Sequence, residues 1–272
     1  MLICQISDLH IKVPGALSYG IVDAAAYLRR CIAQVLAQRQ RPDIVVITGD
    51  LVDFGRADEY AHLAELLQPL TMPVYLLPGN HDDRDTLRAS FPGHDYLRQM
   101  GDFIQYAVDA GPLRILALDS VISGQSGGEL CANRLAWLDA RLSEAPARPT
   151  VILMHHPPFA TGIGHMDRIG FANPSDLAQI VQRHPQVERV LCGHLHRPIQ
   201  VRFAGIVAST CPGPAHQVAL DLAADAPSRF VLEPPGYQLH LWDEGSGLIS
   251  HTAYVGEFAG PYPFYHDGKL ID

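Results

Sequence analysis

Short clusters of aspartate, histidine and asparagine follow strand-like apolar runs at five places in this sequence. The clearest example is Asp50, which comes after the β-branched run 44–48 and Gly49. A carboxylate is costly to bury alone, so we expect Asp50 to be paired or to bind a cation. The candidate metal ligands at the five places are Asp8, His10, Asp50, Asn80, His155, His194 and His196.

These ligand types indicate both the kind of metal and the number of ions. Carboxylate, imidazole and amide groups without a thiolate suit borderline divalent metals such as Mn, Fe, Co or Zn. Seven ligands exceed what one ion with an open position needs. Two ions that share Asp50 as a bridge would use all of them. The sequence therefore predicts a centre of two divalent metal ions.

The spacing inside the clusters also bears on which side chains can act together. Residues i and i+2 of an extended segment point to the same face, so Asp8 can act with His10, and His194 with His196. His155 and His156 are adjacent and would point to opposite faces of an extended segment. At most one of these two is therefore expected to be a ligand.

The elements that must position these residues are strands whose carboxyl ends lie together. Strand-like runs cover 2–7, 44–48 and 73–78, and helical patterns lie between them at about 22–40 and 58–67. This β-α-β-α-β order is typical of a covered, mainly parallel sheet. The carboxyl ends of such strands open onto one crevice.

The second half of the chain begins with further strands and helices. It contains a hairpin, two strands that end in histidines and two helices, at 103–118, 150–158, 187–196, 132–142 and 174–183. An irregular loop is expected at 162–173. From Pro198 to Tyr254 short β-like pieces alternate with Pro/Gly-rich turns, which indicates a second β layer and an inserted region near 212–236. The tail after residue 254 is expected to be irregular.

Composition narrows the class of protein. The chain has 272 residues, of which 47% are hydrophobic, and its net charge of −9 disfavours an extended nucleic-acid partner. A small phosphate ester is still compatible, because bound metals can reverse the local field. We see no apolar run of the ~20 residues that would span a membrane and no signal peptide. Five widely spaced cysteines without a CxxC pair suggest a reducing cytoplasm.

Each candidate residue also has an ordinary structural explanation. Asp8 or Asp50 could cap the following helix, a histidine at a strand end could be a hydrogen-bonded structural residue, and Asn80 could belong to a simple turn. These separate explanations are less convincing when they are taken together. Each strand would then end, by coincidence, in an unrelated polar residue at the same edge of the sheet.

Taken in order, the five clusters resemble the motifs of the calcineurin-like metallophosphoesterase superfamily. They are Asp8-x-His10, Gly49-Asp50-x-x-Asp53, Gly79-Asn80-His81-Asp82, His155 in MHHPP, and Gly193-His194-x-His196. Secondary features resemble the branch of class III cyclic-nucleotide phosphodiesterases and bacterial glycerophosphodiesterases. These are Tyr19-Gly20 with Asp23, the MHHPP form, and Ser209-Thr210-x-Pro212-Gly213 leading to His216-Gln217.

The resemblance implies a role for each residue. One metal would be held by Asp8, His10, Asp50 and His196, and the other by Asp50, Asn80, His155 and His194. His81 would face the phosphate and either stabilise it or protonate the leaving alkoxide. His216 and Tyr19 would contact the substrate.

The resemblance also implies a fold and an assembly. The expected fold class is α/β (α+β), a four-layer α/β/β/α sandwich of two mixed sheets flanked by helices, with a small β-rich cap. Residues 1–197 and 240–272 would form the catalytic domain and 198–239 the cap insertion. Relatives use the cap to build a dimer or a larger homo-oligomer.

The implied function is hydrolysis of small phosphodiesters by in-line attack of a metal-bound hydroxide. Cyclic 3′,5′-nucleotides such as cAMP and glycerophosphodiesters are both candidate substrates. A phosphomonoesterase or a nucleotide-pyrophosphate hydrolase of the same superfamily is the alternative. Gly55 and Asp82 depart from the protein Ser/Thr phosphatase pattern. A non-catalytic protein-binding scaffold of the same fold belongs to a different class, which bound metal would distinguish.

Overall fold

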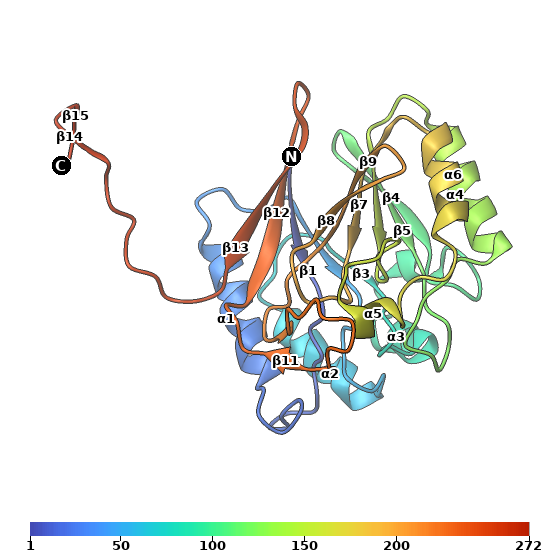
Figure 1. The fold of residues 1–272 in the computed structure, drawn as a ribbon, viewed down its shortest axis with the longest axis horizontal. Coiled ribbons are helices and arrows are strands. Elements are labelled where there is room, and N and C mark those ends of the chain that lie inside the picture. The colour runs from blue at the N-terminus through green and yellow to red at the C-terminus, as the bar shows by residue number, and fades with distance from the viewer. Residues whose placement is uncertain (272) are drawn as a thin grey trace.

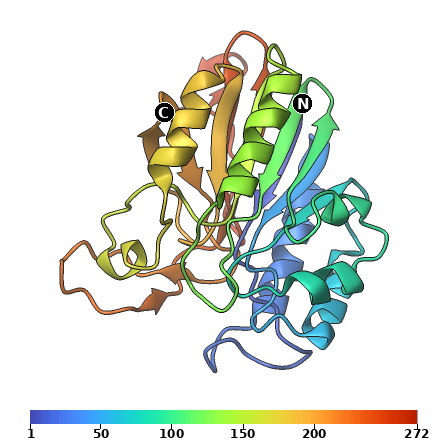
Figure 2. The same cartoon turned by 90° about the vertical axis from the view of Figure 1, so that its right-hand side faces the viewer.

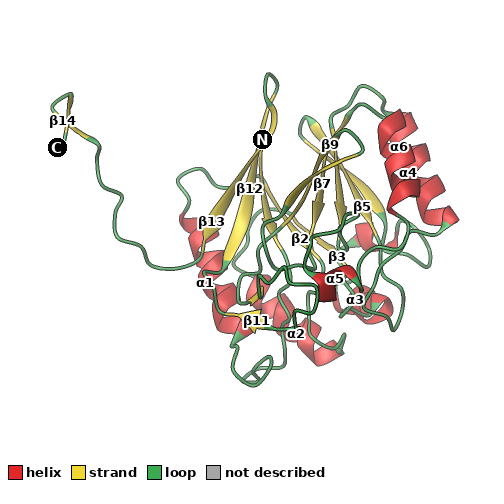
Figure 3. Cartoon of the chain, viewed as in Figure 1, coloured by secondary structure: helices red, strands yellow, loops and turns green. Residues whose placement is uncertain are grey.

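Two β-sheets pack face to face in the computed structural model, which describes residues 1–271, and helices cover the outer face of each (Figures 1 and 3). One sheet has five strands in the order β13-β12-β1-β2-β3, and the other has six in the order β4-β5-β6-β7-β9-β8. Both sheets contain parallel and antiparallel pairs. The predicted four-layer sandwich of two mixed sheets is confirmed.

The five-stranded sheet carries the first three clusters of polar residues. Its strands β1, β2 and β3 run parallel, and β12 pairs antiparallel with β1. Every residue of β1 and β2 is buried, as expected for strands covered on both faces. The strands are β1 (Leu2–Ile6), β2 (Ile44–Thr48), β3 (Val74–Leu77), β12 (Gly236–Asp243) and β13 (Gly247–Tyr254).

The six-stranded sheet carries the other two clusters. Its central strands β5, β6, β7 and β9 are parallel, whereas β4 and β8 at the edges are antiparallel to their neighbours. The strands are β4 (Tyr106–Ala110), β5 (Leu113–Leu118), β6 (Thr150–Met154), β7 (Val187–Cys192), β8 (Gln200–Phe203) and β9 (Ile206–Thr210).

The helices lie on the outside of the sandwich, and Figure 2 shows α4 and α6 in front of the six-stranded sheet. Apolar residues of α1 recur at helical spacing and are buried, and the Asp23 side chain accepts a hydrogen bond from the backbone N–H of Ala26 at its start. This helix ends at Ala37 rather than Gln40, because Gln38 already has an extended backbone. The helices are α1 (Ala24–Ala37), α2 (Ala57–Leu67), α3 (Arg84–Ser90), α4 (Ala132–Glu144), α5 (Gly164–Asp167) and α6 (Pro174–Arg183).

Several short elements complete the chain. A 3₁₀ turn covers Asp95–Arg98, and two-residue strands form two small hairpins, β10 (Gln217–Val218) with β11 (Phe230–Val231) and β14 (Tyr265–His266) with β15 (Lys269–Leu270). Within the segment 198–239, β8 and β9 lie in the six-stranded sheet and β12 begins in the other. The stretch outside both large sheets is therefore 211–235. The single turn α5 lies in the segment expected to be an irregular loop.

A buried polar chain connects the two sheets. The side-chain amide of Gln5 on β1 donates to Thr48 Oγ1 and to the carbonyl of Cys192 on β7, both at 3.0 Å. Gln5 Oε1 accepts from His240 Nε2 at 3.0 Å, and His240 Nδ1 lies 2.7 Å from Ser250 Oγ. Gln5, Thr48, Cys192 and His240 are buried and Ser250 is partly buried, so these hydrogen bonds fix how the sheets sit behind the functional edge.

Candidate active site

The predicted ligands lie together where β1, β2, β3, β6 and β7 end. Each follows the last residue of its strand by one to four positions, so the parallel strands deliver them to one edge of the sandwich. Five of them have a left-handed backbone, which is uncommon for residues other than glycine. These are Asp8 (φ 58°), His10 (47°), Asp50 (49°), His194 (71°) and His196 (52°).

Two glycines allow the strand ends to approach this closely. A Cβ atom on Gly79 would lie 2.2 Å from Asp50 Oδ1, and one on Gly193 would lie 2.1 Å from Ser7 Oγ. Any side chain at either position would therefore push apart the segments that carry the ligands.

The first ligand group consists of Asp8, His10, Asp50 and His196, whose ligand atoms all lie within 4.8 Å of one another. The Nε2 atoms of His10 and His196 are 3.2 Å apart. His10 Nε2 lies 3.6 Å from Asp50 Oδ2, and His196 Nε2 lies 3.7 Å from Asp8 Oδ1. These atoms converge on one point, as ligands of a single ion would.

The second ligand group surrounds His155. Its Nε2 atom lies 3.1 Å from Asn80 Oδ1 and 3.4 Å from Asp50 Oδ2, and its ring centre lies 5.1 Å from that of His194. Asp50 Oδ2 therefore faces an imidazole from each group. Asp50 Oδ1 accepts the backbone N–H of His81 at 3.0 Å, which holds the carboxylate in this orientation.

The histidine tautomers are set by oxygen atoms behind the rings. His10 Nδ1 donates to Asp53 Oδ1 (3.3 Å), His155 Nδ1 to the carbonyl of Thr48 (2.9 Å), and His196 Nδ1 to that of His216 (3.2 Å). In all three Nδ1 carries a proton, so Nε2 is the atom that can offer a lone pair to a metal. This is the usual arrangement around metal-binding histidines. Burial alone would lower the pKa of these rings, but nearby carboxylates outweigh it and raise the pKa of His10, and that of His155 to about 9, so a metal binding there would displace a proton from Nε2.

The buried atoms without partners fit a cationic occupant. Within residues 1–271, Asp8 Oδ2 and His194 Nε2 are buried and have no hydrogen-bond partner. Burial raises the pKa of Asp8 to about 6 and lowers that of His194 to about 3. A carboxylate that lacks partners and a neutral imidazole are each stabilised when a divalent cation binds to them. The residues present therefore suit divalent metal ions.

His81 lies beside the first group and faces the open side of the site. Its Nδ1 donates to the backbone carbonyl of Asp53 at 2.8 Å, which leaves Nε2 free, and about a third (34%) of its side chain is exposed. Its ring meets that of His10 edge-on at 4.6 Å. His81 is therefore placed to contact a molecule in the cavity.

The cavity above the ligands has a volume of about 490 Å³ and is lined by His81, Tyr19 and His216, among others. Tyr19, His216 and Phe230 form an aromatic wall with ring centres 4.8–5.5 Å apart. Burial lowers the pKa of His216 to about 3, so its ring is neutral. Met166 and Ile169 also line the cavity, near α5.

The sequence profile of the calcineurin-like phosphoesterases matches residues 1–198. This chain belongs to the calcineurin-like phosphoesterase family. A protein of Arcobacter nitrofigilis named probable glycerophosphodiester phosphodiesterase GpdQ is 41% identical over 277 residues, covering 100% of both chains. The 3′,5′-cyclic adenosine monophosphate phosphodiesterase CpdA of Pseudomonas aeruginosa is 30% identical, covering 90% of this chain and 87% of its own.

Solved structures agree on the fold of this calcineurin-like chain. A dimetal phosphatase from Danio rerio superposes with a TM-score of 0.63 at 18% identity, covering 94% of this chain and 99% of the other. Across residues 1–271, we find no helix with the length and apolar character to span a bilayer.

Sequence reasoning on this family member missed several residues of the site. Lys12 Nζ lies 3.0 Å from Asp53 Oδ2, and although burial opposes ionisation, the hydrogen bonds from His10 and Lys12 lower the pKa of Asp53 to about 2. His156 lies 2.8 Å from Ser120 Oγ and 3.1 Å from the carbonyl of Ser126, a cavity residue. In the sequence, the position of His156 next to the candidate ligand His155 could have indicated that it lies beside the site.

The side of the cavity formed by the β10–β11 hairpin carried no such signal in the sequence. Ser228, Arg229 and Phe230 line it from the β10–β11 hairpin, whose strands have two residues each. Strands this short show no periodicity in the sequence.

Proposed function

We propose that this calcineurin-like protein is a metal-dependent phosphodiesterase that hydrolyses small phosphodiesters. The observation that carries the proposal is Asp50, whose Oδ2 faces imidazoles of two ligand groups at the base of a cavity that exposes His81. Relatives named as phosphodiesterases cover nearly the whole chain.

The residues that would hold the metals follow from the two groups. Asp8, His10, Asp50 and His196 would bind one ion, and Asp50, Asn80, His155 and His194 the second. Divalent ions bound here would lower the pKa of water toward neutrality and withdraw charge from phosphoryl oxygens. The imidazole, carboxylate and amide donors favour Mn, Fe, Co or Zn.

His81 would act on the substrate itself. His81 lines the cavity and its Nε2 is free, so when the ring is protonated at both nitrogens it can donate a hydrogen bond to a phosphoryl oxygen or a proton to the leaving oxygen. The Asp53 carbonyl keeps the proton of Nδ1 in place and so orients the ring. His216 and Tyr19, at the aromatic wall, would contact the alcohol part of the substrate.

The size of the cavity supports a small diester. A volume of about 490 Å³ accommodates a nucleotide or a glycerol phosphodiester, and the acidic chain offers no basic stripe for a polymer. Cyclic 3′,5′-nucleotides and glycerophosphodiesters both remain in the proposal, since relatives carry both names.

Two further parts of the proposal concern assembly and compartment. We propose that the stretch 211–235 within the predicted 198–239 segment acts as the cap, and that the protein forms a homodimer or larger homo-oligomer. All five cysteines are free and four are buried, which suits a reducing cytoplasm.

Turnover of a bis-aryl phosphodiester and of the matching monoester, with Mn²⁺ and then with chelator, tests the function. We expect faster diester hydrolysis that chelator abolishes. A preference for the monoester would instead indicate a phosphatase. No turnover and no bound metal would favour a binding scaffold.

A further inference from the structure

A second cavity adjoins the cavity above the ligands, which is here called the main cavity. This second cavity, here called the α3 cavity, has a volume of about 420 Å³. It is lined by the start of α3 and by residues 102–103 and 121–124. Asn80, a member of the second ligand group, lines both cavities. The two cavities therefore meet at the proposed metal centre.

The two cavities lie on different sides of the strand ends. The main cavity is lined by Phe230 of the β10–β11 hairpin, and the α3 cavity by Arg84 of α3. Figure 2 shows this hairpin, in orange, at the lower left and α3, in teal, at the lower right. A phosphoryl group held at the ligand groups would have a cavity on each side.

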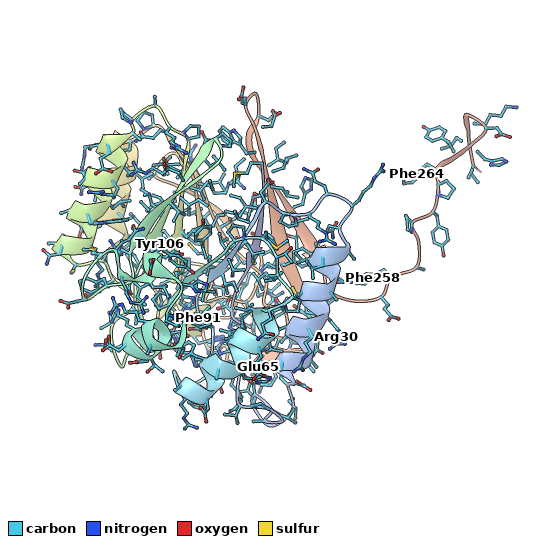
Figure 4. The ribbon with its side chains drawn as sticks, turned by 180° about the vertical axis from the view of Figure 1, so that it is seen from behind. Arg30, Glu65, Phe91, Tyr106, Phe258 and Phe264 are labelled. Atoms are coloured by element: carbon cyan, nitrogen blue, oxygen red, sulfur yellow. The ribbon has the colours of Figure 1, made fainter. Side chains whose placement is uncertain are left out.

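The walls of the α3 cavity are held by the body of the protein. Arg84 Nε and Nη2 lie 2.6 and 2.8 Å from the two carboxylate oxygens of Asp119, and Nη1 donates to Ser123 Oγ at 3.0 Å. At the other end of α3, Phe91, labelled in Figure 4, packs on Tyr60 of α2 with ring centres 6.4 Å apart. Because α3 is held at both ends, the cavity is a built part of the fold.

A phosphodiester carries two alcohol groups, and hydrolysis treats them differently. A water oxygen bonds to phosphorus, one alcohol leaves with a proton, and the other alcohol stays on the phosphoryl group as a monoester. A proton donor to the leaving oxygen must lie within hydrogen-bond reach of it. His81 lines the main cavity, so the leaving alcohol belongs there.

We propose that the α3 cavity binds the alcohol that stays on phosphorus. This inference rests on the phosphodiesterase function proposed above and narrows its substrate class. An open-chain diester of two separate alcohols would occupy both cavities, with the phosphoryl group between them at Asn80. In a cyclic 3′,5′-nucleotide a single sugar carries both ester oxygens, so the α3 cavity would stay without an occupant. The site is therefore better suited to open-chain diesters such as glycerophosphodiesters.

The side chains of the α3 cavity indicate which retained alcohols fit. Four aspartates and two arginines line it. Both guanidinium groups are already paired, Arg84 with Asp119 and Arg88 with Asp85 at 3.2 Å. An alcohol with a further anionic group would meet unpaired carboxylates, so neutral or cationic alcohols should bind better.

Two diesters with the same leaving group test the proposal. Bis-nitrophenyl phosphate and methyl nitrophenyl phosphate both release nitrophenol, but the retained alcohol is an aryl group in the first and a methyl group in the second. Ser123→Trp would fill the α3 cavity. We expect kcat/KM of this variant to fall at least about tenfold for the bis-aryl diester and to stay within about twofold for the methyl diester.

A second variant and a second readout separate this effect from damage to the site. Asp102→Trp fills the cavity from another wall and should give the same selective loss. Metal content by mass spectrometry should equal that of wild type in both variants, which shows that Asn80 is undisturbed. Ser175→Trp, exposed on α6, is the matched control and should change neither rate. Cyclic 3′,5′-AMP should lose no more turnover than the methyl diester does.

The outcomes distinguish this inference from the function on which it rests. Equal losses for the two diesters, or no loss for either, would overturn the assignment of the α3 cavity while leaving the phosphodiesterase function in place. If wild type with Mn²⁺ hydrolyses neither diester, the proposed function itself is wrong.

Discussion

The two sides of the catalytic cavity differ in burial, backbone and origin. The ligand side is formed by strand ends in the core, where Asp8, His155 and His194 are almost fully buried. The cap side is formed by the short β10–β11 hairpin and the loop before α1, where Tyr19 is 55% exposed. One side is held by two sheets, and the other by a few local contacts.

This difference indicates that the two sides have different roles in the proposed reaction. Groups that need fixed spacing and low dielectric lie where the core holds them, as preorganised electrostatics requires. Groups that we propose contact the alcohol part of the substrate lie on the β10–β11 hairpin and the loop before α1, outside both large sheets. Substitutions on the ligand side should therefore affect turnover, and those on the cap side should affect substrate binding.

The largest effect is expected for Asp50→Asn on the ligand side. The change removes the charge that faces both ligand groups, so we expect kcat/KM to fall by at least about 10³-fold. Metal analysis by mass spectrometry should show fewer ions per chain. Asp225→Asn, on an exposed stretch of the cap, is the matched control and should behave as wild type. Activity of Asp50→Asn within tenfold of wild type would contradict the dependence of turnover on the ligand side.

His81→Asn should give the next largest loss. Removal of a proton or hydrogen-bond donor to the leaving oxygen should lower kcat by about 10²–10³-fold. Metal content should stay unchanged, since His81 is in neither of the two proposed ligand groups. The exposed His251→Asn on β13 serves as control. A parallel loss of metal would instead make His81 a ligand.

The next prediction concerns His240, which belongs to the buried hydrogen-bonded chain between the two sheets, and the pH dependence of stability. Burial lowers its pKa to about 3, so the folded state keeps it neutral while the unfolded state protonates below about 6.5. The unfolded state then binds more protons, and stability falls as pH decreases from 6.5 toward 3. Between pH 7.5 and 5.0 the contribution of this group is about 2 kcal/mol.

Urea unfolding of His240→Gln with chelator present should show the difference. At pH 7.5 the free energy of unfolding of the variant should be lower than that of wild type, because Ser250 loses a hydrogen-bond partner. Between pH 7.5 and 5.0 this free energy should fall by about 2 kcal/mol less in the variant than in wild type. Equal losses for the two proteins would mean that His240 is protonated in the folded state.

The smallest effect is expected on the cap side, for Phe230→Ala. Loss of one aromatic contact should raise KM for a natural diester about 3–10-fold with little change in kcat. The exposed Leu222→Ala, elsewhere on the cap, should leave both constants unchanged. A fall in kcat at constant KM would show that the cap side also takes part in the chemistry.

The same division explains what could be predicted from the sequence. Asp50, His155 and the other ligand candidates were identifiable because several strands end in such a residue at the same edge of a sheet, a coincidence that the ordinary explanation of each residue alone does not cover. The covered, mainly parallel sheet followed from the order of strands and helices, and the sandwich of two mixed sheets from the resemblance to the family. The structure brings these candidates together at one edge, and their roles as ligands remain proposals.

The cap side could not be predicted in this way. Phe230 and Arg229 meet the cavity only because a hairpin with two-residue strands folds back over it, and no pattern of that length specifies a direction. Strands β8 and β9 read as part of an insertion because Pro/Gly-rich turns surround them. Their place in the six-stranded sheet is decided by pairing with β7, which is a tertiary contact.

The left-handed backbone at Asp8, His10, Asp50, His194 and His196 has a consequence for how this fold can change over time. Each such residue disfavours the folded state by about 1–2 kcal/mol relative to glycine in the same conformation. A descendant that used the fold only as a scaffold would gain stability from glycine at these positions. Five large polar side chains in this conformation are therefore a stability cost of the proposed metal site.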